Sequence, residues 1–272
     1  MLNKISIRSQ NLKCLRLKGT NFNTITPQNF QIPESLVELS VVAHGKNLLY
    51  KSFIFPQNLQ ILNFHHKLRR IPKVPSKLKN LHIVYDPLKA TQSDFAGLPT
   101  SLEVLTLKVS TNVKRYMLIP DVSHLVNLKK LYFSSVEFKD CNVESINLDN
   151  FPKLLTDLYV NGCRVQKVIG NFTDFPNLKA LSLDNNNLND WLSPLPNEFS
   201  FSDTIESISL RGNKLDNDTV RTLVSYLKDT YPNFRQLFVD TTNLSRDMHY
   251  LVMERYLVSY RTMHPVLDEP IF

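Results

Sequence analysis

The chain of 272 residues has a hydrophobic content of 42%, enough to bury a sizeable core, and its 6 glycines and 15 prolines exclude a collagen-like or low-complexity composition. No apolar run reaches the roughly 18 residues of a membrane span, and the stretch MLNKISIRSQ lacks the apolar middle of a signal peptide. The net charge of +7 is compatible with an acidic partner but does not by itself indicate nucleic acid.

One pattern recurs along the whole chain. It has the form Leu-x-x-Leu-x-apolar, often with a proline before it, as in IPESLVELSV and FPQNLQILNF. We number its positions from the first leucine or its equivalent, which recurs after 19 to 29 residues. The occurrences begin at Leu12, Leu36, Leu59, Leu78, Leu102, Leu128, Leu155, Leu178, Ile205 and Phe234. About ten repeats are therefore expected, the first motif spanning residues 12–17 and the last 234–239.

Each motif is expected to form a strand. Side chains alternate between the two faces of a strand, so positions 4 and 6 should face a core and positions 5 and 7 should face away from it. One repeat cannot bury its apolar side alone, whereas stacked repeats bury a continuous core. We therefore expect an α/β solenoid with one parallel sheet of about ten strands. Seven prolines that end the connections support this expectation: Pro33, Pro56, Pro75, Pro99, Pro152, Pro176 and Pro232.

The connections between strands are expected to be loops or short helices, with two longer helices towards the C-terminus. The stretch DNDTVRTLVSYLKDT can be capped by Asp216 or Asp218. Its inward-facing residues are expected to be Val220, Leu223, Val224 and Leu227.

The second helix is expected to begin at Ser245 and to end before Pro265. Its apolar stripe consists of Met248, Val252, Tyr256 and Tyr260. We expect it to cover the end of the core, so that residues 1–244 form the solenoid and residues 245–272 a capping helix and tail. A membrane-binding amphipathic helix is the alternative.

The beginning of the chain differs from the other repeats. The stretch LNKISI imitates the motif at Leu2, Ile5 and Ile7, but only ten residues separate Leu2 from Leu12, too few for a full turn. Exposed strand edges invite pairing with other chains. We therefore expect either that this chain is the C-terminal part of a longer protein or that something covers this end.

Three stretches extend the motif further. LKALSLDNNNL places Asn186 at position 9, IESISLRGNKL places Asn213 there, and LTDLYVNGCRV places Cys163 there. At these residues the sequence resembles the leucine-rich-repeat family, whose pattern is L-x-x-L-x-L-x-x-[N/C]-x-L. Other repeats hold other residues at position 9, so the family's ladder of asparagines is expected to be broken. The irregular repeat lengths are similar to those of intracellular fungal-type repeat proteins, including the F-box class.

The resemblance implies a horseshoe whose concave face is a parallel sheet that binds a protein partner without catalysis. It also implies a role in substrate recognition for a ubiquitin ligase. The alternative is a regulatory scaffold subunit for a phosphatase, a GTPase or a chromosome-associated assembly.

No motif for catalysis is present: the sequence has no Gly-rich phosphate loop, no G-x-S-x-G and no H-E-x-x-H. We expect no enzyme activity and no cofactor, although a pairing of Cys14 or Cys141 with a histidine is left open. Three cysteines without paired spacing favour a reducing, intracellular compartment, either cytoplasm or nucleus.

The only grouped histidines, His65, His66 and His82, belong to adjacent repeats. A metal site normally needs three or four ligands, so ordinary surface histidines are favoured and no metal is expected.

The outward positions of the strands define the predicted binding face. Tyrosine is enriched at recognition surfaces but is also a good strand former, and both interpretations stay open for Tyr132 and Tyr159. The predicted partner-binding residues are Asn63, His65, His82, Tyr85, Lys108, Tyr132, Tyr159, Asp184, Arg211 and Phe238.

A basic cluster that no acid interrupts falls in one repeat and the connection that follows it. It consists of Lys67, Arg69, Arg70, Lys73, Lys77 and Lys79. A solvated basic loop is the favoured interpretation, and a surface for an anionic partner is the alternative. We do not expect nucleic acid, because the segment lacks interleaved aromatic residues and a known binding module.

Overall fold

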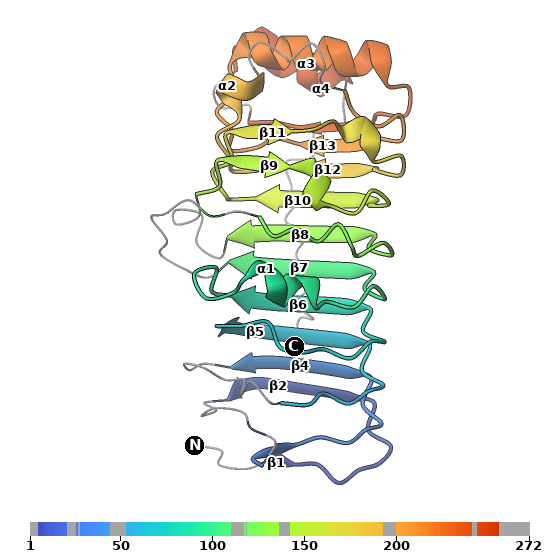
Figure 1. Ribbon diagram of the computed structural model, residues 1–272. Coiled ribbons are helices and arrows are strands. Elements are labelled where there is room, and N and C mark those ends of the chain that lie inside the picture. The colour runs from blue at the N-terminus through green and yellow to red at the C-terminus, as the bar shows by residue number, and fades with distance from the viewer. Residues whose placement is uncertain are drawn as a thin grey trace.

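A parallel sheet of ten strands runs the length of the molecule in the computed structural model (Figure 1). The structure describes residues 5–20, 26, 28–43, 53–109, 117, 119–135, 142–192, 200–240 and 244–255. The strands are β2 (Cys14–Thr20), β4 (Glu38–Ala43), β5 (Ile61–Leu68), β6 (Asn80–Tyr85), β7 (Val104–Val109), β8 (Lys130–Ser135), β10 (Asp157–Asn161), β12 (Ala180–Ser182), β13 (Ser207–Ser209) and β14 (Gln236–Phe238). They lie side by side in chain order, which confirms the predicted solenoid.

The motif sets where each strand begins. Every strand of the large sheet starts at position 3, from Cys14 in the first repeat to Gln236 in the last. Equivalent positions of neighbouring strands are partners over most of the sheet, as in the pairing of Tyr132 with Tyr159. The predicted register is therefore confirmed, apart from a shift between Lys18 and Thr20 at the end of β2 and a shift within β5 that is described below.

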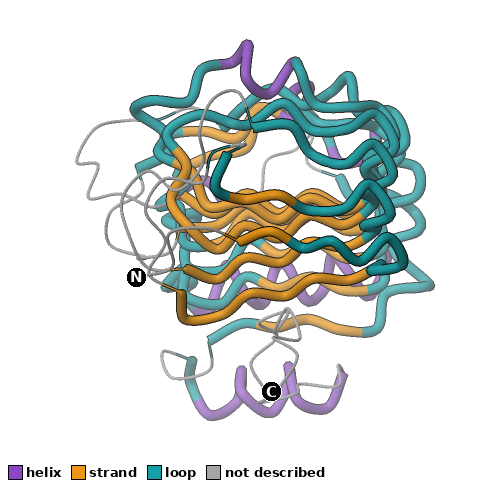
Figure 2. Tube along the Cα trace, turned by 90° about the horizontal axis from the view of Figure 1, so that it is seen from below, coloured by secondary structure: helices purple, strands orange, loops and turns teal. Residues whose placement is uncertain are grey.

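The side opposite the large sheet, which we call the loop side, carries the connections (Figure 2). It contains two small parallel sheets, one of β1 (Ile5–Ser6) with β3 (Phe30–Gln31) and one of β9 (Ser145–Asn147) with β11 (Lys167–Ile169). The short helices are α1 (Gln92–Ala96), η1 (Leu148–Asn150), η2 (Phe172–Asp174) and α2 (Asn189–Leu192).

A tight turn precedes each strand from β4 onwards. In each of these repeats the N–H of the position 1 residue donates to the carbonyl three residues earlier, as Leu36 does to Pro33 at 3.1 Å. Five of the acceptors are prolines: Pro33, Pro56, Pro75, Pro99 and Pro152. Proline is well tolerated at this position because the turn uses its carbonyl and does not need the N–H that proline lacks.

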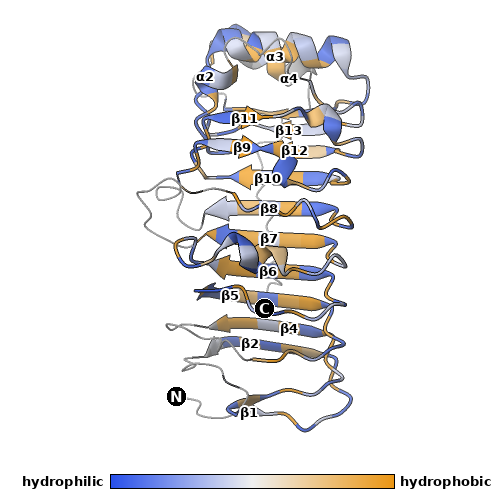
Figure 3. Ribbon diagram, viewed as in Figure 1, coloured by the Kyte–Doolittle hydropathy of each residue, from blue (hydrophilic) through white to orange (hydrophobic). Residues whose placement is uncertain are grey.

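Inward-facing leucines fill the space between the sheet and the loop side. Leu36, Leu39 and Val41 of the second repeat are fully buried, and their counterparts in the following turns are buried as well. The strands accordingly carry much of the hydrophobic sequence, and the connections carry much of the polar sequence (Figure 3). Truncating one such leucine to alanine costs about 2–5 kcal/mol in a packed core.

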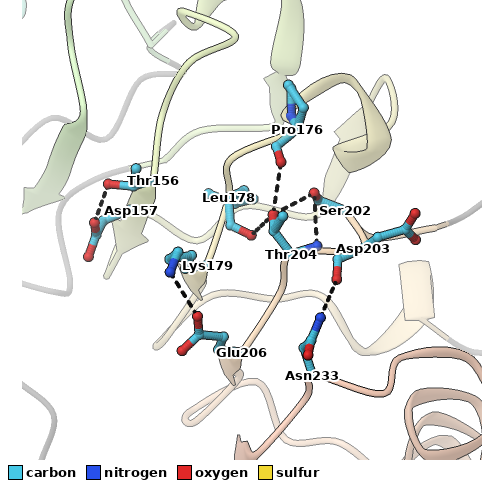
Figure 4. A network of polar contacts seen from close by, with 10 residues as sticks. All are labelled: Thr156, Asp157, Pro176, Leu178, Lys179, Ser202, Asp203, Thr204, Glu206 and Asn233. Carbon is cyan, nitrogen blue, oxygen red and sulfur yellow. Dashed lines mark hydrogen bonds and ion pairs between the residues drawn. The ribbon is translucent and has the colours of Figure 1, made fainter.

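In six repeats a polar side chain directly before position 1 joins the turn to the previous one. Ser35, Ser101 and Thr204 lie within 2.6 to 2.9 Å of the carbonyl oxygen of the previous turn's position 1 residue. The longer asparagines at this position reach a carbonyl further back, as Asn127 does to Thr100 at 2.9 Å. Figure 4 shows these contacts around Thr204, where Asn233 continues the series and Lys179 pairs with Glu206. The repeat motif does not predict this series of hydrogen bonds.

Position 9 asparagines tie turns together inside the core. The side-chain oxygen of Asn186 accepts from the N–H groups of Cys163 and Val165, both at 3.1 Å. Its amide donates to the carbonyls of Val160 and Leu183 at 2.8 and 2.9 Å. Asn213 repeats the arrangement one turn later, with its amide on the carbonyls of Leu183, Leu210 and Arg211.

Two longer helices lie in contact at the C-terminal end, α3 (Asn217–Thr230) and α4 (Arg246–Arg255) (Figure 1). Asp216 caps α3 by accepting from the N–H of Thr219 at 2.8 Å. All four residues predicted to face inward from α3 are buried, as are Met248 and Val252 of α4. Ser245 accepts from the N–H of Met248 as the predicted cap. The rest of the predicted stripe, Tyr256 and Tyr260, lies outside the described residues.

Candidate functional site

The face of the large sheet that points away from the core, which we call the outer face, displays the position 5 residues in one row. Each is the direct partner of the next across the sheet. The row reads Arg16, Ser40, Asn63, His82, Thr106, Tyr132, Tyr159, Ser182, Ser209 and Phe238. It carries no acid, and its only permanent charge is Arg16 at the end.

Tyr132 and Tyr159 form the largest aromatic feature of this row. Their rings stack with centroids 4.7 Å apart and planes inclined by 16°, and both side chains are half-buried. Burial, followed by the nearby Asp157 carboxylate, raises the pKa of both phenols. Both hydroxyls are protonated at neutral pH, and a hydrogen bond with Asp157 further raises the pKa of Tyr159.

Asp157 lies at the start of β10, beside this pair. Its carboxylate pairs with Lys130 at 3.5 Å and accepts from the hydroxyl of Thr156 at 2.6 Å. The charges next to the tyrosines are thus matched within the molecule.

Aliphatic side chains continue the outer face towards the N-terminus. Val42 and Val84 occupy position 7, and Ile61 and Val104 occupy position 3; all four are half-exposed. None of them was among the predicted site residues. The alternation that predicted the tyrosines also places these residues outside, so the sequence contained the signal.

His65 and His82 lie close together, but not in the register that the motif predicts. The pairing shifts between Phe64 and Lys67, so that Lys67 rather than His65 is the partner of Val84. His65 and His66 are the extra residues of this irregularity, and His66 is buried. The rings of His65 and His82 lie with centroids 4.3 Å apart. Such an insertion into a strand cannot be read from motif spacing.

His82 is only 5% exposed, which corrects its prediction as an accessible contact residue. Its Nε2 is buried and has no hydrogen-bond partner among the described residues. Burial, together with the nearby His65 and Lys108, lowers its pKa to about 3, so the ring is neutral at physiological pH. Asn63, the neighbour of His82 in the row, is half-exposed, as is Lys108.

Towards the C-terminus, polar side chains of the outer face are buried and form hydrogen bonds between turns. Asp184 is 6% exposed and accepts from the Ser209 hydroxyl at 2.6 Å and the Arg211 N–H at 2.8 Å. Its pKa is raised, chiefly by burial. The guanidinium of Arg211 lies 4.7 Å from the ring centroid of Phe238, which is fully buried. The prediction that Asp184 and Phe238 are exposed for a partner is therefore wrong.

The placement of Tyr85 on the predicted binding face is also wrong. Its side chain is 2% exposed and packs against Phe95 at a centroid distance of 5.3 Å. Position 8 is even, so the alternation of the strand directs this side chain into the core.

The basic cluster is partly neutralised, contrary to its appearance in the sequence. Lys67 pairs with Asp86 at 3.2 Å, Arg70 with Asp94 at 3.7 Å, and Lys79 with Glu103 at 3.3 Å. All three acids belong to the next turn, so they do not interrupt the cluster in the sequence. The cations of the cluster without an ion pair to a described residue are Arg69, Lys73 and Lys77, all exposed.

Within the described ranges, no three His, Cys, Asp or Glu residues are grouped so that they could hold a metal ion. Of the cysteines left open for catalysis, Cys14 is exposed and Cys141 lies outside the described residues, while Cys163 is buried. No helix in the described part of the chain is long and apolar enough to cross a membrane.

Comparison with known proteins adds no assignment: no family model matches this chain, and no curated protein is similar to it.

Proposed function

We propose that this chain is a non-catalytic binding module that holds a protein partner on the outer face of its sheet, around Tyr132 and Tyr159. The stacked, half-exposed tyrosine pair is the observation that carries the proposal. Tyrosine gives a large contact area for few torsions and retains a polar tip, which is why it dominates recognition surfaces.

The surroundings of the pair favour a protein over a charged ligand. From Ser40 to Ser209 the position 5 row holds no residue that is charged at neutral pH, and the half-exposed aliphatics lie beside it. Covering such a face removes apolar area from water without stripping water from unpaired charges. The core of a typical protein interface has this composition.

The proposal includes membership of the leucine-rich-repeat class, with the outer face as the concave face of a horseshoe. The position 9 hydrogen bonds of Asn186 and Asn213 support it, since they link turns as the family's asparagine ladder does. Substrate recognition for a ubiquitin ligase and a regulatory scaffold role stay predictions from the resemblance.

The test compares three forms of the chain in affinity capture followed by mass spectrometry: native, Tyr132→Ala/Tyr159→Ala and Tyr250→Ala. Tyr250 of α4 is 54% exposed and serves as a matched control. A captured protein is then purified and its Kd measured against each form. We expect the double variant to weaken binding at least about tenfold, since a central interface tyrosine contributes more than about 1 kcal/mol.

Circular dichroism must show the same folded signal for all three forms. An unchanged Kd for the double variant, or an equal loss for Tyr250→Ala, would refute the assignment of the outer face.

A further inference from the structure

The large sheet ends at β2, and among the described residues no strand pairs with its outer edge. β2 has seven residues, which makes this a long strand edge. In Figure 1, β2 is the last strand of the large sheet at the N-terminal end.

The core is incompletely covered at the same place. Leu12, Leu15 and Leu17 are only half-buried, whereas the corresponding leucines of the next repeat are fully buried. The segment that imitates the motif at the beginning of the chain does not cover them with a strand, because Ile5 and Ser6 pair with β3. An added strand with alternating apolar residues would complete both the hydrogen bonding and the burial.

The charges at this edge indicate the chemistry of such a strand. Elsewhere in the sheet, cations pair with acids of the adjacent turn: Glu103 pairs with Lys79 on one side and Lys129 on the other, at 3.3 and 2.9 Å. These three residues share position 2.

Lys13 occupies position 2 of the first repeat, and its neighbour in the next repeat is Val37. Lys18 is the partner of Val42. Both lysines are exposed, and neither has an ion pair with a described residue, so a partner's acidic residues could match them.

We propose that the free edge of β2 binds an extended segment of a partner protein, which adds to the sheet as a further strand and carries acidic residues beside Lys13 and Lys18. Its alternate apolar side chains cover Leu15 and Leu17. A second copy of this chain fits less well, because two β2 edges would bring the lysines of both copies together. This site is separate from the outer face, and the two proposals stand or fall independently.

The experiment uses the full chain and measures the fluorescence anisotropy of labelled synthetic peptides. The test peptide alternates valine with small polar residues and carries glutamate at both ends. One control peptide has lysine in place of glutamate. A second is N-methylated at alternate residues, which blocks backbone pairing but keeps the charges.

We expect the glutamate peptide to bind and both control peptides to fail. Lys13→Glu/Lys18→Glu should weaken binding of the glutamate peptide about tenfold, since two opposite-charge pairs are replaced by like charges that face each other. The matched variant Lys73→Glu/Lys77→Glu changes the net charge equally at exposed lysines of the β5–β6 connection and should leave binding unchanged.

Absence of binding by the glutamate peptide overturns the proposal. So does equal binding of the N-methylated peptide, which would indicate charge attraction alone. Sedimentation showing that the native chain self-associates and thereby excludes the peptide would assign the edge to a second copy instead.

Discussion

Replacing Asn186 by alanine should cost several kcal/mol of stability, as should the same change at Asn213, whose side chain also makes four hydrogen bonds. Asn186 is 3% exposed, and its amide makes four hydrogen bonds with two turns. Alanine removes all four and leaves two N–H groups and two carbonyls in the core. At about 1 kcal/mol for each bond, the loss is about 4 kcal/mol, a large part of the roughly 5–15 kcal/mol that stabilises a typical domain.

Urea unfolding followed by circular dichroism measures this cost, and hydrogen exchange shows where it acts. Protection from exchange should fall first at the N–H groups of Cys163 and Val165, because both donate hydrogen bonds to the side-chain oxygen of Asn186. Asn58→Ala is the control, because Asn58 makes one exposed bond to the Glu34 carbonyl and its loss should cost less than about 1 kcal/mol. A cost for Asn186→Ala no larger than that of the control would refute the view that this amide joins the turns.

Four further predictions test register and electrostatics. Leu131→Ala should lower the free energy of unfolding by about 2–5 kcal/mol and Tyr132→Ala by only about 1 kcal/mol, because the first faces the core and the second the outer face; equal costs in urea unfolding would contradict the register. Folding depresses the pKa of His82 from 6.5 to about 3, so the neutral ring's contribution to the free energy of unfolding is fully present above pH 6.5. This contribution is lost as the pH falls towards 3, by up to about 1.4 kcal/mol per pH unit. His82→Gln should make the melting temperature less dependent on pH over this range. Burial raises the pKa of Asp184, so the contribution of its protonated form to the free energy of unfolding is present below pH 3.8 and is lost as the pH rises through the folded-state pKa. Asp184→Asn should therefore raise Tm at pH 7 and not at pH 3. A lower Tm at pH 7 would contradict this explanation. Asp216→Ala should cost about 1 kcal/mol and reduce the helical circular dichroism, and an unchanged melt would show that the cap is dispensable.

Local periodicity is the reason that much of the fold could be predicted. Motif positions 4 and 6 face the core and position 5 faces out because strand side chains alternate, and this rule needs no knowledge of the neighbouring turn. It correctly placed Tyr132 and Tyr159 on the same face, and the same rule contradicts the choice of Tyr85. Tyr85 stands at position 8, which the alternation directs into the core.

The electrostatic errors have a different origin. Lys67 and Asp86 both stand at position 9 of consecutive repeats, so comparing equal positions in adjacent turns would have found their ion pair. The burial of Asp184 and His82 depends on the side chains packed around them in neighbouring turns, and the irregularity in β5 depends on an insertion that preserves the motif. A single sequence does not encode these features in a form that spacing can reveal.

Cross-linking from the outer face tests the central claim most directly. A photoreactive residue is placed at Ser134, which is half-exposed on the outer face beside Tyr132, and in a second form at Leu88, which is 59% exposed in the connection before α1. Each form is irradiated with the captured partner, and the products are identified by mass spectrometry. We predict a cross-link from position 134 and none from position 88. A partner that cross-links only from position 88 would contradict the claim that the outer face is the binding surface.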